Sequence, residues 1–253
     1  MSLETPALRA GTRPPRARPQ AVIFDWGGTL TRWHDIDFHA ESRALAAAVV
    51  NAEHHSEAEL TDRLLQAGDV IWGRSRDTQR SARIEDLFDE AGLDHDPELL
   101  HAYRGFWEPH TQTDPEVRPL WERLRAEGLK IGVLSNTIWP REWHRAFFER
   151  DGVLDLIDGD VYSSEIAWTK PAPQAFAAAR AAVGVEDPAA CVYVGDRLFE
   201  DVWGPQQARM RSIFVPHSTI PTAQQGHTEG EPDAVVRRLS EIADVVRDWS
   251  APS

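Results

Sequence analysis

Short apolar runs alternate with longer stretches of helical periodicity from Gln20 onward. A short apolar run that ends at a polar or glycine residue is typical of a buried strand. Such runs predict strands at Ala21–Phe24, Leu129–Leu134, Asp160–Tyr162, Cys191–Val194 and Ser212–Val215. Apolar residues at helical spacing predict helices between and after them, at Glu116–Glu127, Arg141–Arg150, Pro173–Val183 and 240–249. This alternation predicts an α/β fold, a doubly wound parallel sheet with helices on both faces.

One long segment interrupts the alternation, because residues 34–114 contain no convincing strand. Helical spacing there covers Asp37–Val50, Glu57–Ile71, Arg83–Ala91 and Pro97–Trp107. We expect this segment to form a helical cap inserted into a core made of residues 20–33 and 115–253. Residues 1–19 combine arginines and prolines with few apolar residues, which predicts a disordered tail.

The composition excludes several classes of function. The chain has 27 Lys+Arg against 41 Asp+Glu, a net charge of −14, which disfavours binding to nucleic acids or anionic membranes. No apolar run approaches the roughly 18 residues of a membrane span. A single cysteine, Cys191, and no visible signal peptide favour a cytoplasmic protein. Between Arg32 and Asp114 there are 18 acidic and 8 basic residues, so this segment, which contains the predicted cap, carries −10 and disfavours highly anionic substrates.

Polar residues with catalytic potential follow three of the predicted strands. Asp25, Ser135 and Asp196 each stand at a strand end, where parallel sheets of this class bind their ligands. Asp201 follows Asp196 by five residues on the same loop. Any one of these acids could simply cap a helix or loop, but three at one edge would repel each other without a cation. Because Mg²⁺ prefers carboxylate oxygens, the pattern predicts a magnesium site.

Two further elements suit a phosphate group. The hydroxyl and backbone N–H groups of Ser135-Asn136-Thr137 could hold phosphoryl oxygens, although these residue types also favour ordinary turns. Lys170 precedes Pro171 and is one of only two lysines in the chain. Its point charge suits phosphate, and the alternative is a surface lysine.

Taken together, these residues form a recognisable series of motifs. Four motifs follow one another along the chain: Phe24-Asp25-Trp26-Gly27-Gly28-Thr29-Leu30, Leu134-Ser135-Asn136, Thr169-Lys170-Pro171, and Val194-Gly195-Asp196 with Asp201. In this order they resemble the motifs of the haloacid dehalogenase superfamily, and the resemblance covers residues 20–250. The resemblance implies that Asp25 is a nucleophile that becomes phosphorylated, and that a helical cap of the first cap class covers the site. It assigns Mg²⁺ to Asp25, the Gly27 carbonyl, Asp196 and Asp201, the last directly or through water. It assigns a small phosphorylated substrate to Gly28, Ser135, the Asn136 amide and Lys170, with Lys170 also offsetting charge on the nucleophile.

The chain departs from the phosphatases of that superfamily at Gly27, where they carry a second aspartate that acts as general acid and base. Such a group contributes roughly 10²–10⁴-fold to the rate. One interpretation is therefore a Mg²⁺-dependent hydrolase in which water, a cap residue such as His34, or a good leaving group replaces the acid. A second is a catalytically degenerate protein that binds a phosphorylated ligand or a protein partner.

The third interpretation is that the chain performs another reaction of the superfamily, and its residues argue against three such reactions. Asp196 and Asp201 argue against metal-free dehalogenation, and the predicted cap has no lysine for phosphonate cleavage. Sugar-phosphate mutases need the missing acid. A homodimer is possible, but the sequence does not decide the oligomeric state.

Tryptophans lie near every motif: Trp26, Trp139, Trp168 and Trp203, with Trp33 and Trp107 in or near the cap. We hypothesise that they form an apolar rim that favours an aromatic leaving group. The alternative is that they fill space beneath loops.

Overall fold

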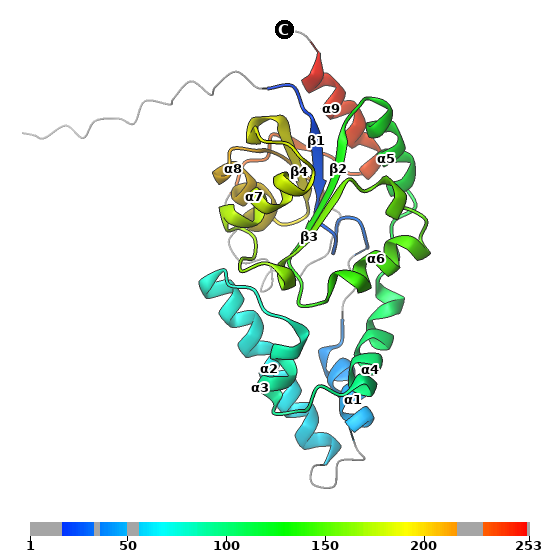
Figure 1. Cartoon of the computed structure of the whole chain (residues 1–253), viewed down its shortest axis with the longest axis vertical. Helices are drawn as coiled ribbons and strands as arrows, with labels where there is room; N and C mark the ends of the chain where they lie inside the picture. Colours follow the sequence, from blue (N-terminus) through cyan, green and yellow to red (C-terminus); the bar gives the residue numbers. More distant parts are fainter. Residues whose placement is uncertain (1–16, 33–35, 50–55, 217–229, 252–253) are drawn as a thin grey trace, which may run out of the picture.

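The computed structural model describes residues 17–32, 36–49, 56–216 and 230–251 of the chain. Its centre is one sheet of parallel strands in the order β3-β2-β1-β4-β5-β6 (Figure 1). The strands are β1 Ala21–Phe24, β2 Lys130–Ser135, β3 Gly159–Tyr162, β4 Cys191–Gly195, β5 Arg211–Phe214 and β6 Ala234–Val235. The central position of β1, between β2 and β4, places Asp25 in the middle of the sheet edge.

Helices cover both faces of this sheet, as the alternation predicts. The helices α5 Val117–Ala126, α6 Arg141–Arg150 and α9 Ile242–Ser250 lie on one side, and α7 Pro173–Ala182 and α8 Gly204–Gln207 lie on the other (Figure 1). Successive residues of β1 point to opposite sides: Val22 and Phe24 join one apolar core, and Ala21 and Ile23 join the other. The predicted doubly wound α/β fold is confirmed.

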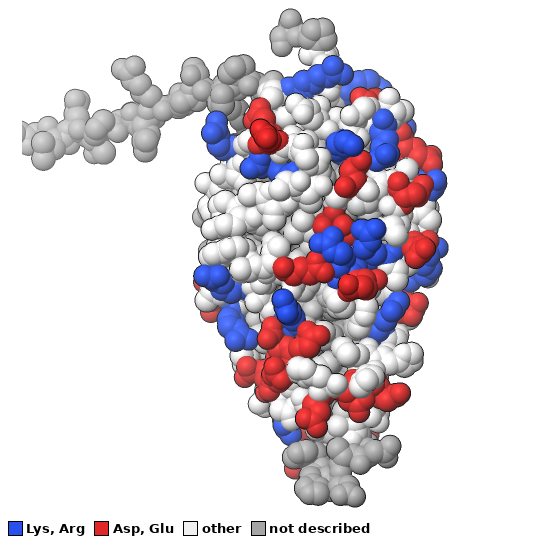
Figure 2. All heavy atoms as spheres, in the orientation of Figure 1, with Lys and Arg blue, Asp and Glu red and all other residues white. Residues whose placement is uncertain are grey.

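Four helices form the lower part of the molecule in Figure 1. They are α1 Phe38–Val49, α2 Glu57–Thr78, α3 Ile84–Ala91 and α4 Pro97–Trp107, and α1 packs against both α2 and α4. The two segments that join them to the sheet lie side by side, with a bridge between Thr31 and Thr113 and a bond from the Asp114 N–H to the Leu30 carbonyl. Acidic side chains predominate over this lower part on the face shown in Figure 2.

The structure differs from the sequence prediction where apolar periodicity is weak. Helix α2 continues to Thr78 instead of ending at Ile71; the Thr78 hydroxyl donates to the Arg74 carbonyl in its last turn, and the Ser75 hydroxyl donates to the Arg80 carbonyl just beyond its end. The strand β6, the helix α8 and the π-helical segment Leu198–Trp203 are too short to show a periodicity and were not predicted.

Some expectations concern residues outside the described part of the chain. These include residues 1–16 of the predicted tail, and both Trp33 and His34. Within the described residues, no helix combines the length and the apolar character that crossing a membrane requires.

Candidate active site

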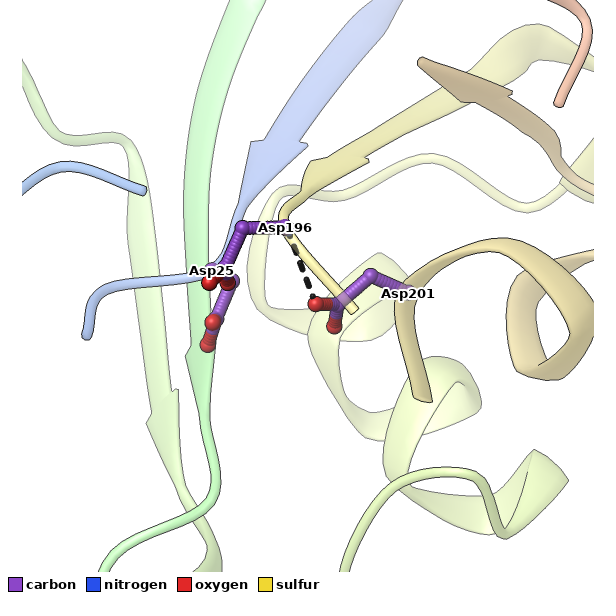
Figure 3. A group of neighbouring side chains, drawn as sticks. All are labelled: Asp25, Asp196 and Asp201. Atoms are coloured by element: carbon purple, nitrogen blue, oxygen red, sulfur yellow. Dashed lines mark hydrogen bonds between the residues drawn. The ribbon is translucent and has the colours of Figure 1, made fainter. Parts of the chain in front are cut away.

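Three buried carboxylates meet at the carboxyl edge of the sheet (Figure 3). Asp25 follows β1, Asp196 follows the neighbouring β4, and Asp201 lies in the π-helical segment just beyond. Each offers an oxygen atom, and these atoms all lie within 4.8 Å of one another. The sequence prediction that these acids converge is therefore confirmed by the fold, since parallel neighbouring strands deliver them to one edge.

Lys170 binds two of these acids. Its Nζ donates to Asp25 Oδ1 and to Asp201 Oδ1, each at 2.7 Å. The lysine is 3% exposed, so it is a buried charge between carboxylates and not a surface residue. Burial alone would lower the pKa of Lys170, but Asp201 and Asp25 outweigh this effect and hold its pKa well above the usual value. The lysine is therefore charged at neutral pH.

One positive charge does not balance this site. When ionised, the three carboxylates and the ammonium sum to −3 + 1, or −2. Burial, reinforced by Asp201 and Asp196 and opposed by Lys170, raises the pKa of Asp25 to about 8. A divalent cation would balance the −2 charge, and carboxylate oxygens are the donors that Mg²⁺ prefers. The donor set and its charge therefore fit a magnesium ion.

Asp201 is held in place by the loop that follows β4. Its Oδ2 accepts a hydrogen bond from the backbone N–H of Asp196 at 3.1 Å (Figure 3), and a second one from the backbone N–H of Arg197 at 2.9 Å. Gly195 permits this close approach, because a Cβ there would overlap the Asp201 side chain. With one oxygen on backbone amides and the other on Lys170, Asp201 is better placed to support a metal ion than to be its main ligand.

The two glycines after Asp25 have different surroundings. Gly28 has a φ of +83°, and a Cβ there would lie 2.5 Å from Asp196 Oδ2. Thr29 completes this contact, since its hydroxyl donates to Asp196 Oδ1 at 3.2 Å. A Cβ at Gly27, in contrast, would have no atom of the other described residues within 4 Å, its two chain neighbours aside. Gly28 is thus required by the close packing against Asp196, whereas at Gly27 there is open space where a side chain could stand.

The predicted phosphate loop lies at the end of β2, where Ser135 is buried. The Asn136 side chain contacts the backbone of Lys170 on both sides: Oδ1 accepts from its N–H at 2.7 Å and Nδ2 donates to its carbonyl at 3.0 Å. This side chain therefore fixes the position of Lys170, a role that the motif spacing alone did not reveal.

A buried histidine contacts the loop after β2. His144 Nε2 lies 3.3 Å from Thr137 Oγ1, which accepts from the Trp139 N–H at 3.0 Å. The His144 ring stacks on Tyr162 with centroids 4.2 Å apart, and burial lowers the pKa of His144 to about 3. His144 thus contacts this loop, and its place on α6 left no signal in the sequence.

Trp26 and Trp139 do not belong to the hypothesised rim. Trp26 and Trp139 are only 8% and 6% exposed, and they pack against each other and His144 in the core on the α6 side. Trp168 stacks under the Arg80 guanidinium, and Trp203 stacks on Phe199. For Trp26 and Trp139, the alternative of filling space beneath loops is the correct one.

The four-helix segment contacts the core beside Lys170. The turn after α2 runs antiparallel to residues 164–169: the Thr169 N–H donates to the Gln79 carbonyl at 3.0 Å, and Arg80 pairs with Trp168. On the other side of the segment, Trp139 Nε1 donates to Tyr103 Oη of α4 at 3.3 Å. Helices α1–α4 are thus attached to the loops after β2 and before Lys170.

Comparison with known proteins supports the same family as the motifs. Residues 19–209 match the family of haloacid dehalogenase-like hydrolases. A glyceraldehyde 3-phosphate phosphatase of Methanopyrus kandleri is 27% identical over 90% of this chain and 97% of its own length. A phosphoglycolate phosphatase of Cereibacter sphaeroides is 31% identical over 69% of this chain and 75% of its own length. The crystal structure of an HAD phosphatase from Thermococcus onnurineus superposes with a TM-score of 0.64 and 25% identity, covering 90% of this chain and 97% of that one.

Proposed function

Since the chain belongs to the haloacid dehalogenase-like hydrolases, we propose that it is a Mg²⁺-dependent phosphatase that acts on a small phosphate ester or acyl phosphate. The buried cluster of Asp25, Asp196, Asp201 and Lys170 carries this proposal. The whole-length similarity to a glyceraldehyde 3-phosphate phosphatase, and the partial similarity to a phosphoglycolate phosphatase, support a small phosphorylated substrate.

In the proposed mechanism an oxygen of Asp25 attacks phosphorus, and the bond from phosphorus to the leaving oxygen breaks with its electron pair on that oxygen. Water then attacks the phosphoaspartate, releases inorganic phosphate and restores the carboxylate of Asp25. Lys170 favours the ionised form of Asp25 by opposing the rise of its pKa, and it offsets charge on the phosphoryl group, while Ser135 and the backbone N–H of Asn136 hold the phosphoryl oxygens. Positioning and electrostatic stabilisation of this kind are what phosphoryl transfer requires of a protein.

The metal site of the proposal consists of Asp25, the Gly27 carbonyl and Asp196, with Asp201 in support. A bound Mg²⁺ would supply positive charge next to the phosphoryl oxygens. Gly28 would border the substrate, because its lack of a side chain lets the loop after β1 lie against Asp196.

Residues 34–114 are proposed to be the helical cap, of the first cap class, and residues 20–33 and 115–253 the catalytic core. The contact of Gln79 and Arg80 with residues 164–169 supports this division, because through it the helical segment touches the loop that carries Lys170. Two attachments on opposite sides of the segment would enclose a substrate and exclude water.

Gly27 favours a second candidate, a degenerate protein that binds a phosphorylated ligand without turning it over. Among the described residues, no side chain stands in the open space at residue 27 to protonate a leaving group. One experiment separates the candidates: wild type and Asp25→Asn are assayed with a panel of phosphate esters, with Mg²⁺ and with EDTA. The enzyme proposal requires turnover that both the substitution and the chelator abolish. Ligand binding without turnover would support the second candidate, and turnover that survives both changes would refute the mechanism.

A further inference from the structure

A buried aromatic ring lies against the ammonium of Lys170. Tyr193 stands on β4, two residues before Gly195, and is fully buried. The Lys170 Nζ lies over its ring at 5.3 Å from the centroid. On its other sides the same Nζ donates to Asp25 and Asp201. The ammonium is thus enclosed by two carboxylates and one aromatic face.

Tyr193 also reaches the strand that delivers Ser135. Its hydroxyl donates to the carbonyl of Leu134, the residue before Ser135, at 2.9 Å. Phe176 of α7 packs edge-on against the ring at 5.2 Å, which fixes its plane. One side chain therefore touches Lys170 with its face and the end of β2 with its hydroxyl.

We propose that Tyr193 is a positioning residue for Lys170, which rests on the proposed function in which Lys170 is catalytic. A lysine side chain has a flexible stem and three rotatable donors. The hydrogen bonds to Asp25 and Asp201 use two of these donors and leave the third side of the ammonium without a contact of its own. The negative face of the ring attracts the ammonium, more strongly here than at an exposed site because water is excluded. Together these features hold the Nζ against Asp25 in the geometry that phosphoryl transfer needs.

The kinetic test compares Tyr193→Leu, which removes the aromatic face, with Tyr193→Phe, which keeps it and loses only the hydroxyl. We expect kcat per mole of folded protein to fall about tenfold in the leucine variant, the size of a desolvated cation–π contact, with KM changed by less than about threefold. The phenylalanine variant should stay within about threefold of wild type. Phe148→Leu is the matched control, since Phe148 is an equally buried ring in the core on the opposite face of the sheet.

A second measurement does not depend on activity. Only Lys130 and Lys170 are lysines, so labelling with ¹³C-lysine gives a spectrum of two residues. Lys130 is exposed at the start of β2, whereas the side chain of Lys170 lies over the ring. The ring current should shift the Lys170 εCH₂ protons upfield in wild type and in Tyr193→Phe, and this shift should vanish in Tyr193→Leu.

The outcomes separate this proposal from the one on which it rests. Equal kcat in the leucine and phenylalanine variants, an equal loss in Phe148→Leu, or two unshifted lysine signals in wild type would each overturn the role of Tyr193. If Tyr193→Leu does not fold, the wild-type and phenylalanine spectra still decide whether the ring lies against Lys170. A Lys170→Ala variant with unchanged kcat would instead overturn the proposed function.

Discussion

Restoring an acid at Gly27 should raise the activity of this protein. Apart from its chain neighbours, no described residue has an atom within 4 Å of a Cβ at residue 27, and the backbone there is not left-handed, so the first side-chain atom of Gly27→Asp introduces neither overlap nor strain. The new carboxyl would stand beside a buried cluster of negative charge, which raises its pKa and favours the protonated form that an acid catalyst needs. A positioned general acid is worth about 10²–10⁴-fold in rate, or about 3–5 kcal/mol of barrier.

The assay measures kcat/KM with an alkyl phosphate and with an aryl phosphate, at fixed Mg²⁺. Because an alkoxide needs a proton to leave and a phenolate needs it far less, we expect a gain of about 100-fold for the alkyl ester and less than about fivefold for the aryl ester. Gly27→Asn is the matched control, since it has nearly the same shape and cannot donate an acidic proton. The reasoning is refuted if aspartate and asparagine give the same rates, or if the two esters gain equally. Gly28→Ala is the opposite control: it should lose activity because its Cβ would lie 2.5 Å from Asp196 Oδ2.

Further predictions concern the supports of the site. Burial lowers the pKa of His144 from 6.5 to about 3, so the unfolded chain binds its proton more readily. The stability that neutral His144 contributes is complete above about pH 6.5 and is lost as the pH falls toward 3. Urea titrations at pH 7 and pH 5 should therefore show about 2 kcal/mol more acid destabilisation in wild type than in His144→Gln; equal losses would contradict this. Asn136→Ala removes both side-chain bonds to the backbone of Lys170, and steady-state kinetics should show kcat/KM lower by about tenfold or more. Arg80→Ala should weaken the attachment of the four-helix segment by about 1 kcal/mol, seen as faster amide exchange in residues 164–169 while exchange in the sheet is unchanged.

The sequence predicted those parts of the site that depend only on the order of strands. Asp25, Ser135 and Asp196 each end an apolar run, and parallel strands bring their ends to one edge whatever the loops do. The alternation of apolar runs and helical periodicity likewise predicted helices on both faces of the sheet and the helices inserted after β1. It could not give β6, whose two residues are too few to show a pattern.

Other parts of the site depend on where individual side chains point, which residue order does not determine. Trp26 is adjacent to Asp25 in sequence, yet its ring packs into the core on the α6 side while the aspartate faces Lys170. Proximity to a motif therefore misled the hypothesis of an aromatic rim. The hydrogen bonds of Asn136 to the backbone of Lys170, and the ring of Tyr193 against its ammonium, join positions far apart in the chain. No periodicity or spacing records such contacts.

In the proposed mechanism, Gly27 makes the acidity of the leaving group the variable that decides between turnover of a phosphate ester and binding without turnover. The other parts of the proposed chemistry have residues to perform them: Asp25 is in contact with Lys170, and the carboxylate donors lie within 4.8 Å of one another. What the described site lacks at residue 27 is a proton donor, so an alkyl ester would have to leave as a strongly basic alkoxide. An acyl phosphate or aryl phosphate leaves as a weak base and needs no such donor. We therefore expect log kcat/KM to fall steeply as the pKa of the leaving group rises, and to fall much less steeply in Gly27→Asp. A shallow dependence already present in wild type would mean that another group supplies the proton.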